Sequence, residues 1–477
     1  MRKRLAKKRV LTTALEELER LHRENAQLRR ENAELRARLL ELERRLSQNS
    51  RNSSKPPSSD PPSTPPPPPK PPTGRHPGAQ PGHTGHQRPL APPEEVDATI
   101  PVKPDKCGGC GAALSGDDPN PRRHQVAEIP KTKPKITEWQ LHTLTCGRCR
   151  RQTTAALPPG VPAGAFGPRA VAIASLLTGF YRMGRRMASA AMFDLFGMPM
   201  CVGSVSASEQ QTSAAVATPV AEAQDFVKRQ NVKGGDETSW FEGAKRGKVW
   251  LWAAFTQWVA VFLIRPSRGT DVAKELLGKA FGVLITDRWC AYLWWPLRWR
   301  QLCWAHLKRH FQAFVDAGGK SARVGAALLE ETTLLFEWWH RVRDGTLARS
   351  TFRRYVIPLR RRVGALLRKG AVCGYRPTEA TCRELLKLEP ALWTFVRVEG
   401  VEPTNNCTER IIRPGVMWRK LCFGTHSKAG SRFAERMLTV TCTLRRQGRN
   451  VVDYVTSAVE ARLQGTAPPS LLPLVSR

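Results

Sequence analysis

A run of prolines divides this sequence more sharply than any other feature. Sixteen of its 38 prolines lie between Pro56 and Pro93. Proline has no backbone N–H and holds φ at roughly −65°, so such a segment can neither continue a helix nor take an interior place in a sheet. We therefore expect an extended, disordered linker over residues 49–100. The rest of the 477-residue chain must fold as separate parts, about three domains in number.

Before the linker, apolar residues repeat with a seven-residue period. One seam position holds Leu11, Leu18, Asn25, Asn32, Leu39 and Leu46, and the other holds Ala14, Leu21, Leu28, Leu35 and Leu42. About five such heptads favour a parallel two-stranded coiled coil, because a buried asparagine pairs best with its own copy. We therefore expect residues 1–48 to form a leucine zipper that makes the protein a homodimer or a higher oligomer. A monomeric helix packed on the body is the alternative. A basic-zipper transcription factor is excluded, because only about ten of the roughly twenty basic-helix residues it requires precede the first heptad.

The net charge indicates the kind of partner. Lys and Arg number 76 against 41 Asp and Glu, which gives a net charge of +35 and a pI near 10.5. Nucleic acid is the expected partner of so basic a chain, and an anionic membrane surface is the second candidate. The apolar stretch Val249–Ile264 is shorter than the roughly 20 residues of a membrane span, and the basic start lacks the apolar core of a secretory signal. We expect a cytoplasmic protein without a membrane partner, associated with the nucleoid when it binds DNA.

Four of the twelve cysteines form two pairs with identical spacing. Cys107 and Cys110 enclose two glycines, and Cys146 and Cys149 enclose Gly-Arg. Two such pairs can place four thiolates around one structural, tetrahedral Zn²⁺, so we expect a zinc-binding module over residues 101–160. Four unrelated thiols are the alternative. The residues between the pairs are expected to form short strands with a basic, DNA-binding face made by Arg122, Arg123, Lys131 and Lys133.

Residues 165–230 have the apolar periodicity of helices interrupted by glycines. Ser206 and Glu209 have the spacing of a capping box, which predicts that the last helix opens there. A helix-turn-helix would present such a helix to the major groove, with Arg185 and Arg186 as DNA contacts. A helical pair with a purely structural role is an equal alternative.

The next segment has the pattern of an α/β domain with acidic residues on its strands. Residues 231–287 predict a strand, a hairpin to a second and a third strand, a helix and a buried fourth strand. Asp236 lies on the first strand and Asp287 ends the fourth, so we expect them side by side on adjacent central strands. Neighbouring carboxylates in a ribonuclease H-like sheet hold hard divalent cations. An acidic residue that ends a strand is also an ordinary turn residue, so neither aspartate alone identifies a site.

A third carboxylate comes from a later helix. Asn405 or Asn406 can cap a helix that carries Glu409 one turn in. A side chain projecting from that helix toward the sheet would complete the metal site with Asp236 and Asp287. The rival carboxylates are Glu237, Glu399 and Glu402.

Taken in order, these motifs resemble those of the insertion sequence 66 family of DDE transposases. The resemblance covers nearly the entire chain: the zipper, the S-x-N-S-S-K-P-P-S-x-D and G-x-x-P-G-H-x-G-H segments and the two cysteine pairs. It continues with D-E-T at Asp236, T-D at Asp287, C-W-A-H-x-x-R-x-F from Cys303 and N-N-x-x-E-R-x-I-R-P up to Pro414. The last two motifs are the most specific. Cys407 and Cys422 differ from what the family pattern leads us to expect.

The resemblance implies an enzyme that binds transposon-end and target double-stranded DNA, cleaves a phosphodiester and transfers the strand. Asp236, Asp287 and Glu409 would be its catalytic triad and would hold two Mg²⁺. Cys303 and His306 form a C-x-x-H signature, for which packing or positioning is favoured over a further metal site. Accessory transposition proteins are left open as partners. The candidate phosphate-binding residues are Arg410, Arg413, Arg419 and Lys420.

The expected fold class is α/β, with a ribonuclease H-like catalytic domain. Its parts would be a coiled coil (1–48), a linker (49–100), a zinc module (101–160), a helical segment (165–230), a catalytic domain (231–445) with a largely helical insertion (290–398), and a C-terminal helix and tail (446–477). Two alternative functions remain: a catalytically decayed DNA-binding or regulatory protein, and a structure-specific nuclease using the same sheet.

Overall fold

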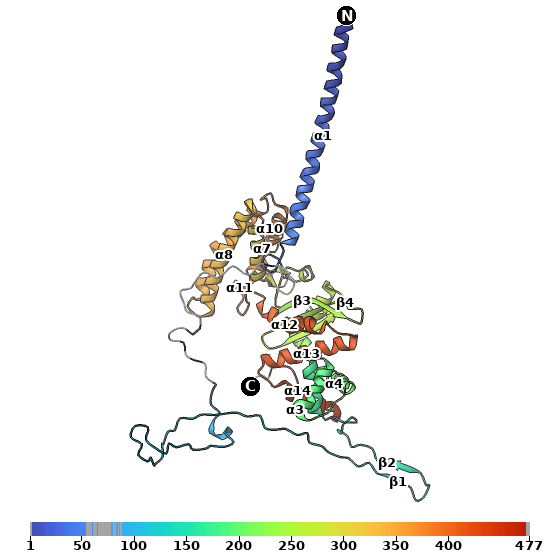
Figure 1. Cartoon of the computed structure of the whole chain (residues 1–477), viewed down its shortest axis with the longest axis vertical. Coiled ribbons are helices and arrows are strands. Elements are labelled where there is room, and N and C mark those ends of the chain that lie inside the picture. The colour runs from blue at the N-terminus through green and yellow to red at the C-terminus, as the bar shows by residue number, and fades with distance from the viewer. Residues whose placement is uncertain are drawn as a thin grey trace. The chain divides into compact units, whose positions relative to one another are not determined.

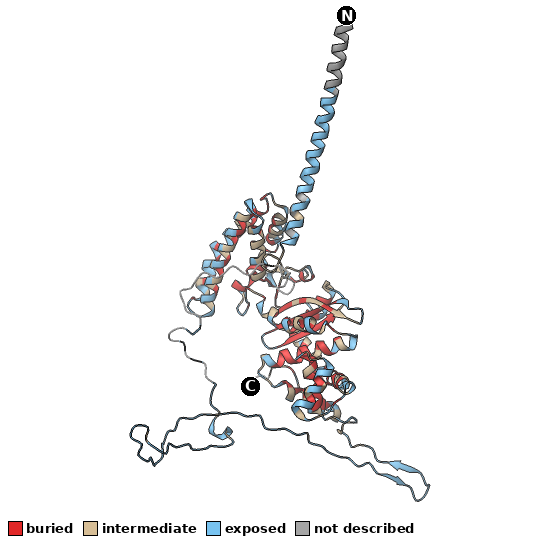
Figure 2. Cartoon of the chain, viewed as in Figure 1, coloured by how far each residue is buried: buried red, intermediate tan, exposed pale blue. Residues whose placement is uncertain are grey.

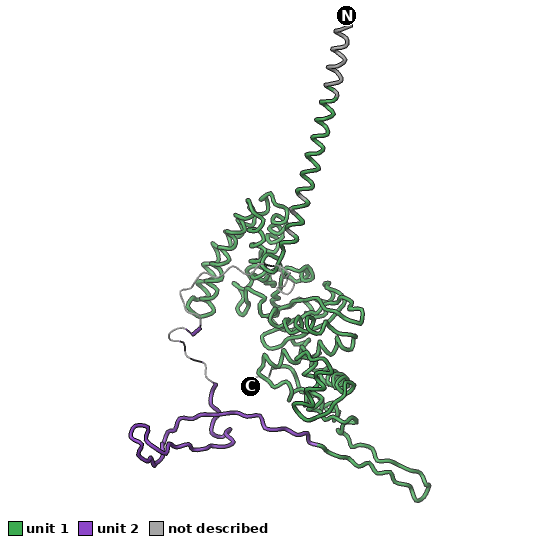
Figure 3. Tube along the Cα trace, in the orientation of Figure 1, with its two compact units in different colours: residues 1–64, 136–477 green, residues 65–135 purple. Residues whose placement is uncertain are grey.

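The structure is a computed structural model that describes residues 2–53, 60, 64, 78–79, 83, 85 and 88–473. In the first helix it describes the side chains from residue 15 on, other than those of 16, 37, 40 and 44. Most of the expected linker therefore lies outside the described residues. The chain divides into two compact units, one of residues 1–64 and 136–477 and one of residues 65–135 (Figure 3).

The heptad region forms one uninterrupted helix, α1 (Arg2–Leu46) (Figure 1). The predicted helix is thereby confirmed, although the side chains of Leu11 and Ala14 lie outside the described residues. The described seam leucines are exposed, namely Leu18, Leu21, Leu28, Leu35, Leu39, Leu42 and Leu46. The leucines of a stripe of this length can be buried only by packing against another helix. Pairing of α1 with a second copy stays a prediction.

The described residues of the 65–135 unit are mostly extended. A short 3-10 helix, η2 (Pro93–Glu95), is its regular element, and Gln125 exchanges hydrogen bonds of 2.7 and 3.0 Å with the backbone of Ala91. Of the strands expected between the cysteine pairs, β1 (Thr143–Thr145) forms, and no strand forms from residue 114 to residue 142, a stretch described in full. For residues 114–142 the prediction was wrong, because the four prolines of this stretch remove N–H donors that a ribbon needs.

The helical pattern of residues 165–230 folds as four helices. They are α2 (Pro168–Gly179), α3 (Arg185–Phe196), α4 (Val202–Ala215) and α5 (Ala217–Lys228). The capping-box prediction was wrong, because Ser206 lies inside α4. The cap is Cys201, whose Sγ accepts a hydrogen bond from the Ser204 N–H at 3.4 Å. Glu209 is instead buried and pairs with Arg185 at 2.6 Å, which joins α4 to α3.

The core of the main unit is a five-stranded mixed sheet. Its strands are β3 (Val232–Glu242), β4 (Gly247–Phe255), β5 (Ala260–Arg265), β6 (Val283–Thr286) and β7 (Arg300–Leu302), in the order β5-β4-β3-β6-β7. The first three form an antiparallel meander, and α6 (Thr270–Leu277) leads to β6, which runs parallel to β3. The predicted succession of strands and helix is confirmed, and the first and fourth strands are neighbours. Strands β5 and β6 are almost wholly buried (Figure 2), as their continuous apolar sequences predict.

A helix covers the free edge of the sheet. In α13 (Lys428–Arg446), residues four apart accept hydrogen bonds from β5: Glu435 from Ile264, Thr439 from Phe262 and Thr443 from Ala260, at 2.5, 3.1 and 3.1 Å. The spacing of four residues on a helix matches alternate residues of a strand, so one face of α13 satisfies these N–H groups. An edge strand without such partners could pair with another chain.

The helices that follow β7 form a second core, to which β6 and β7 also contribute side chains. They are α7 (Trp304–Asp316), α8 (Gly319–Arg343), α9 (Arg349–Gly370), α10 (Arg376–Lys387) and α11 (Thr394–Arg397). The expected insertion 290–398 therefore contains these helices and also β7, the fifth strand of the sheet. Two further helices complete the chain, α12 (Asn406–Cys422) and, at the C-terminal end, α14 (Val451–Gln464). No helix among the described residues is long and apolar enough to cross a membrane.

Candidate active site

Two aspartates leave neighbouring parallel strands at the same level. Gly234 of β3 pairs with Ile285 of β6, and Asp236 and Asp287 each lie two residues further along. Equal register and the two-residue alternation of side chains place both carboxylates on one side of the sheet. Both line a cleft of about 2210 Å³ that Glu409 also lines.

The helix that carries Glu409 is held at its first turn by buried contacts. Asn405, the residue before α12, is buried and donates from Nδ2 to the Gly235 carbonyl at 3.1 Å. Its own N–H donates to the Cys303 Sγ at 3.1 Å, and its carbonyl accepts the Glu409 N–H at 3.1 Å. The start of α12 is therefore fastened to β3, one residue before Asp236, and to the start of α7.

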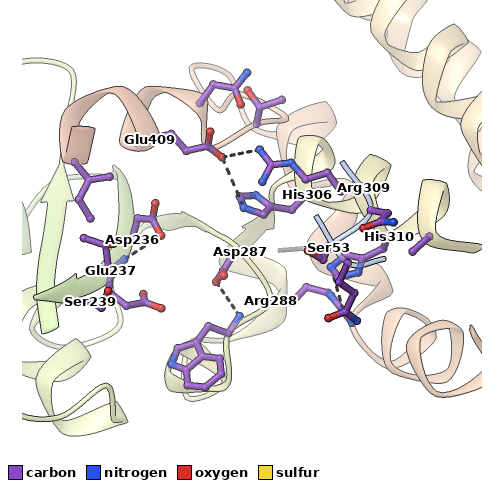
Figure 4. Close-up of a pocket in the computed structure, with 18 of the residues that line it drawn as sticks. Ser53, Asp236, Glu237, Ser239, Asp287, Arg288, His306, Arg309, His310 and Glu409 are labelled. Carbon is purple, nitrogen blue, oxygen red and sulfur yellow. Dashed lines mark hydrogen bonds and ion pairs between the residues drawn. The ribbon is translucent and has the colours of Figure 1, made fainter. Parts of the chain in front are cut away.

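The Glu409 carboxylate lies near two basic side chains of α7 (Figure 4). Its Oε1 is 3.7 Å from His306 Nε2 and 3.9 Å from Arg309 Nη2. Both distances are too long for hydrogen bonds, and in the described part of the chain buried Glu409 Oε1 and His306 Nδ1 have no hydrogen-bond partner. Burial raises the pKa of the Cys303 thiol to about 11, so this cysteine is a neutral packing group.

The electrostatics of the cleft favour a cation. Burial raises the pKa of Asp236 well above its usual range, and the charges of Glu237, Asp287 and Glu409 raise it further. Carboxylate oxygens are the ligands that Mg²⁺ prefers, and the unpartnered Glu409 Oε1 fits such a role. As placed, no three His, Cys, Asp or Glu side chains among the described residues form a metal-binding group.

The rival carboxylates have other environments. Glu237 is buried, with Arg268 on one oxygen and Tyr292 on the other, and burial raises its pKa to about 7. Glu402 lines the cleft and accepts a hydrogen bond from Trp339 Nε1 at 3.2 Å. Glu399 is exposed.

An arginine that lies between two tryptophan rings forms part of the cleft wall, and sequence reasoning did not identify it. The guanidinium of Arg268 lies 3.6 Å from the ring centre of Trp289 and 4.7 Å from that of Trp250. Trp289 is also tied to the site, because its N–H donates to Asp287 Oδ1 at 2.8 Å. Trp294 and Trp295, which are adjacent in sequence, pack on each other, and Trp295 is buried.

The cleft is rich in basic side chains. The expected phosphate-binding residues Arg410, Arg413, Arg419 and Lys420 all line it. Arg419 is hydrogen-bonded to β3, because its Nη1 donates to Thr238 Oγ1 at 2.9 Å and to the Ser239 carbonyl at 2.7 Å. Five more basic residues line the cleft: Lys248, Arg268, Arg288, Arg309 and Arg343. Sequence reasoning did not single out Lys248, Arg268 or Arg343.

The other expected DNA contacts lie elsewhere. Arg185 forms an ion pair with Glu209 that joins α3 to α4, and Arg186 is exposed on α3. The basic residues between the cysteine pairs are exposed in the 65–135 unit: Arg122, Arg123, Lys131 and Lys133.

The two cysteine pairs form turns with the same hydrogen-bond pattern. In the first, Cys107 donates to the Ala112 carbonyl and accepts from Gly111, and in the second, Cys146 donates to Arg151 and accepts from Arg150. The second turn joins the strands of a hairpin, β1 (Thr143–Thr145) and β2 (Gln152–Thr154). Backbone N–H groups lower the pKa of the Cys107 and Cys146 thiols, which favours the thiolate that zinc binds. The two pairs belong to different compact units.

The end of α1 and the residues after it also line the cleft. Glu43, Ser47, Gln48, Asn52 and Ser53 share its wall with Asp236, Asp287 and Glu409. Sequence reasoning placed most of these residues in the coiled coil and the linker, so it missed them as part of the site. A short polar segment after a zipper carries no local signal of what it packs against.

Comparisons with known proteins find two family matches. Residues 172–432, more than half of the chain, match the model described as "Transposase IS66 family", and residues 7–89 match "Family of unknown function (DUF6444)". The chain is also similar to "Uncharacterized protein y4qI" of Sinorhizobium fredii, with 25% identity over 249 residues, 46% of this chain and 45% of that protein. It therefore spans about half the length of this curated relative.

Proposed function

The chain belongs to the IS66 transposase family, and on that premise we propose that it cuts transposon-end DNA and joins the cut strand to target DNA. Asp236, Asp287 and Glu409 would be the catalytic carboxylates. The observation that carries this proposal is that all three, from β3, β6 and α12, line one cleft together with nine basic residues. A cleft that binds a polyanion and still gathers acidic side chains at its centre suits a metal-dependent reaction on DNA.

The proposed fold of the catalytic domain is ribonuclease H-like. Supporting it, β3 and β6 are adjacent and parallel, and Asp236 on β3 and Asp287 directly after β6 lie at the same level. The three carboxylates would hold two Mg²⁺, which when bound activate the attacking oxygen and stabilise the leaving oxygen. Cys303 would act as a positioning residue, because its sulfur accepts the N–H of Asn405 at the start of the Glu409 helix. His306 would act likewise beside the Glu409 carboxylate.

The chain's basic residues would position the DNA. Arg410, Arg413 and Lys420 line the cleft, where they can hold phosphate oxygens of the strand to be cut. Arg419 would serve mainly to hold α12 on β3. We further propose that one Zn²⁺ is bound by Cys107, Cys110, Cys146 and Cys149, and that α1 pairs two chains so that two transposon ends can be brought together.

Replacing single carboxylates tests the proposal. Cleavage and strand transfer are measured with Mg²⁺ on DNA that carries the ends of the element encoding this chain, for the wild type and for Asp236→Asn, Asp287→Asn and Glu409→Gln. Each variant should bind the ends and lose cleavage by at least about 10³-fold, since two-metal sites need every ligand. Asp194→Asn, an exposed aspartate on α3, is the matched control and should cut normally.

The possible results separate three activities. A wild type that binds ends and does not cut would favour a decayed DNA-binding protein and would refute the proposal. Cutting without joining would favour a structure-specific nuclease. Cutting and joining that survive Asp287→Asn would show that the reaction occurs elsewhere.

A further inference from the structure

The residues that follow α1 form a closed, hydrogen-bonded turn. Asn49 and Asn52 are its centre: the Asn49 N–H donates to Asn52 Oδ1 at 2.9 Å, and the Asn49 Oδ1 accepts from the Arg51 N–H at 2.9 Å. The Ser53 hydroxyl donates to the Asn49 carbonyl at 2.6 Å. Ser50 closes the base of a larger loop, with its N–H and hydroxyl donating to the Asp60 carboxylate at 2.7 and 2.6 Å. The polar residues of S-Q-N-S-R-N-S thus have defined partners.

This turn is attached to the helical part of the main unit. Asn52 Nδ2 donates to Asp316 Oδ2 at 3.0 Å, at the C-terminal end of α7. The same helix carries His306 and Arg309 beside Glu409. Ser53 and His310 of α7 line the same cleft (Figure 4). One helix therefore contacts both the turn and the catalytic carboxylate.

The turn lines the cleft without filling it. With Ser47, Gln48, Asn52 and Ser53 in its wall, the cleft still has a volume of about 2210 Å³. A segment that blocked the site would fill this space, and the turn does not. The side chains it presents are amides and hydroxyls, a class of group that contacts phosphate oxygens in protein–DNA complexes, and they carry no negative charge to repel phosphate. The Asn52 amide and the Ser53 hydroxyl donate within the protein and so hold the segment in the cleft wall.

We propose that the segment Ser47–Ser53 is a wall of the DNA-binding cleft and contacts the phosphate backbone of the strand that enters it. This inference rests on the proposed function and adds a second role for the N-terminal part of the chain. Residues 7–89, which match a family of unknown function, would then supply both the helix that pairs two chains and a piece of each active site. The zipper helix and the catalytic domain would then be connected by the hydrogen bond between Asn52 and Asp316 as well as by the linker.

Exchanging the two partners of the anchoring hydrogen bond tests the proposal. In the full-length protein, Asn52→Ala and Asp316→Ala should each slow end cleavage by roughly 3- to 10-fold, the effect of one lost hydrogen bond. The double variant Asn52→Asp with Asp316→Asn reverses donor and acceptor, so it should cut faster than either single variant. Rescue should be partial, because position 52 then carries a negative charge and no longer donates to the Ser47 carbonyl. Gln312→Ala is the matched control, because it removes a 2.9 Å hydrogen bond to the other oxygen of Asp316 and leaves the turn alone.

A second measurement reports DNA contact directly. A photo-crosslinking amino acid at position 48 should attach to a strand of the end DNA, whereas the same group at position 24, exposed on α1, should not.

The outcomes separate this inference from the proposed function. Faster cleavage in both single variants would show that the segment obstructs the site and would overturn the proposal. Wild-type rates in all variants, or no crosslink at position 48, would show a linker without contact to DNA. A wild type that neither cuts nor joins would refute the proposed function first.

Discussion

Half-buried Arg268 pairs with buried Glu237, which is one residue from a proposed catalytic aspartate. Arg268 donates from Nε and Nη2 to Glu237 Oε1 at 2.9 and 2.7 Å, and Tyr292 donates to Oε2 at 2.6 Å. Both oxygens of Glu237 are therefore used within the protein, whereas Asp236 Oδ1 accepts only the N–H of the next residue among the described partners. We therefore expect the two adjacent acids to differ in role, because alternate side chains of a strand face opposite ways.

Glu237→Gln should thus keep DNA cleavage within about tenfold of the wild type, because glutamine still offers Arg268 an oxygen acceptor. Asp236→Asn should abolish cleavage. Both are measured in the same Mg²⁺ assay, with unfolding in urea to confirm that each variant folds. Loss of cleavage in folded Glu237→Gln, with activity retained in Asp236→Asn, would mean that Glu237 and not Asp236 is the catalytic carboxylate.

Arg268 should matter for both stability and DNA. Its removal leaves Glu237, whose side chain is fully buried, without a charged partner, so Arg268→Ala should lower the free energy of unfolding by roughly 3 kcal/mol. Arg268→Lys keeps the charge but loses the planar fork between the Trp250 and Trp289 rings. We expect it to fold and to cut DNA more slowly.

Arg246→Lys is the matched control for that comparison. Its guanidinium is also flanked by two aromatic rings, Phe241 at 5.3 Å and Phe423 at 4.7 Å, but it is not part of the cleft wall. It should cut at the wild-type rate. Equal cleavage by wild type and Arg268→Lys would remove Arg268 from the DNA-binding surface.

Local patterns predicted much of this molecule. The heptads predicted α1, and the apolar runs predicted β3 to β6 with Asp236 and Asp287 on neighbouring strands, because periodicity and strand length are set by residues close in sequence. The Glu409 helix was also predicted, together with Asn405 or Asn406 at its start. What the buried Asn405 side chain does there, bonding to β3, depends on the packing of distant segments.

Contacts between distant residues could not be predicted in this way. Glu237 lies 31 residues from Arg268 and 55 from Tyr292, and the Asn52–Asp316 contact spans 264 residues. The capping box at Ser206 failed for a related reason. Its acid, Glu209, is more strongly stabilised by an ion pair with Arg185 on another helix than by the backbone at a helix start.

Zinc content tests the cysteine pairs. If the two turns share one metal, the wild type should contain about one Zn²⁺ per chain, and Cys107→Ser or Cys146→Ser should each lose it, because three ligands hold a structural site poorly. Cys290→Ser, an exposed cysteine outside both pairs, is the control. Metal is measured by elemental analysis after dialysis. Full zinc in Cys107→Ser would exclude the four-cysteine site.

The oligomeric state tests the exposed stripe of α1. Leu28 and Leu35 occupy the same seam position and are 51% and 64% exposed in the single chain. Burial of a leucine contributes about 1.5–3 kcal/mol, so replacing both by lysine should yield monomers in sedimentation equilibrium. Leu15→Lys, a 55% exposed leucine outside the seam, should remain a dimer. A monomeric wild type would show that the leucine stripe of α1 does not pair two chains.

The buried lysine of β3 should make stability depend on pH. Lys233 is 1% exposed, its Nζ donates to the Lys228 carbonyl at 2.5 Å, and burial lowers its pKa to about 8 from 10.5. Between these two values the unfolded chain binds more protons than the folded one, so the free energy of unfolding rises with pH across that window. Below pH 8 Lys233 is protonated in both the folded and the unfolded chain, so the folded state bears the full free-energy cost of burying its charge.

Lys233→Met should therefore be more stable than the wild type at pH 7, and its advantage should shrink as the pH rises from 8 toward 10.5. Methionine fills a similar volume beside Trp295, whose ring lies 5.4 Å from the ammonium, without a charge to desolvate. Urea unfolding followed by tryptophan fluorescence at several pH values measures the difference. Lys279→Met, at an exposed lysine, should differ from the wild type by an amount that does not change with pH. A Lys233→Met protein that is less stable at pH 7 would mean that the ammonium's hydrogen bond and ring contacts outweigh the cost of burying its charge.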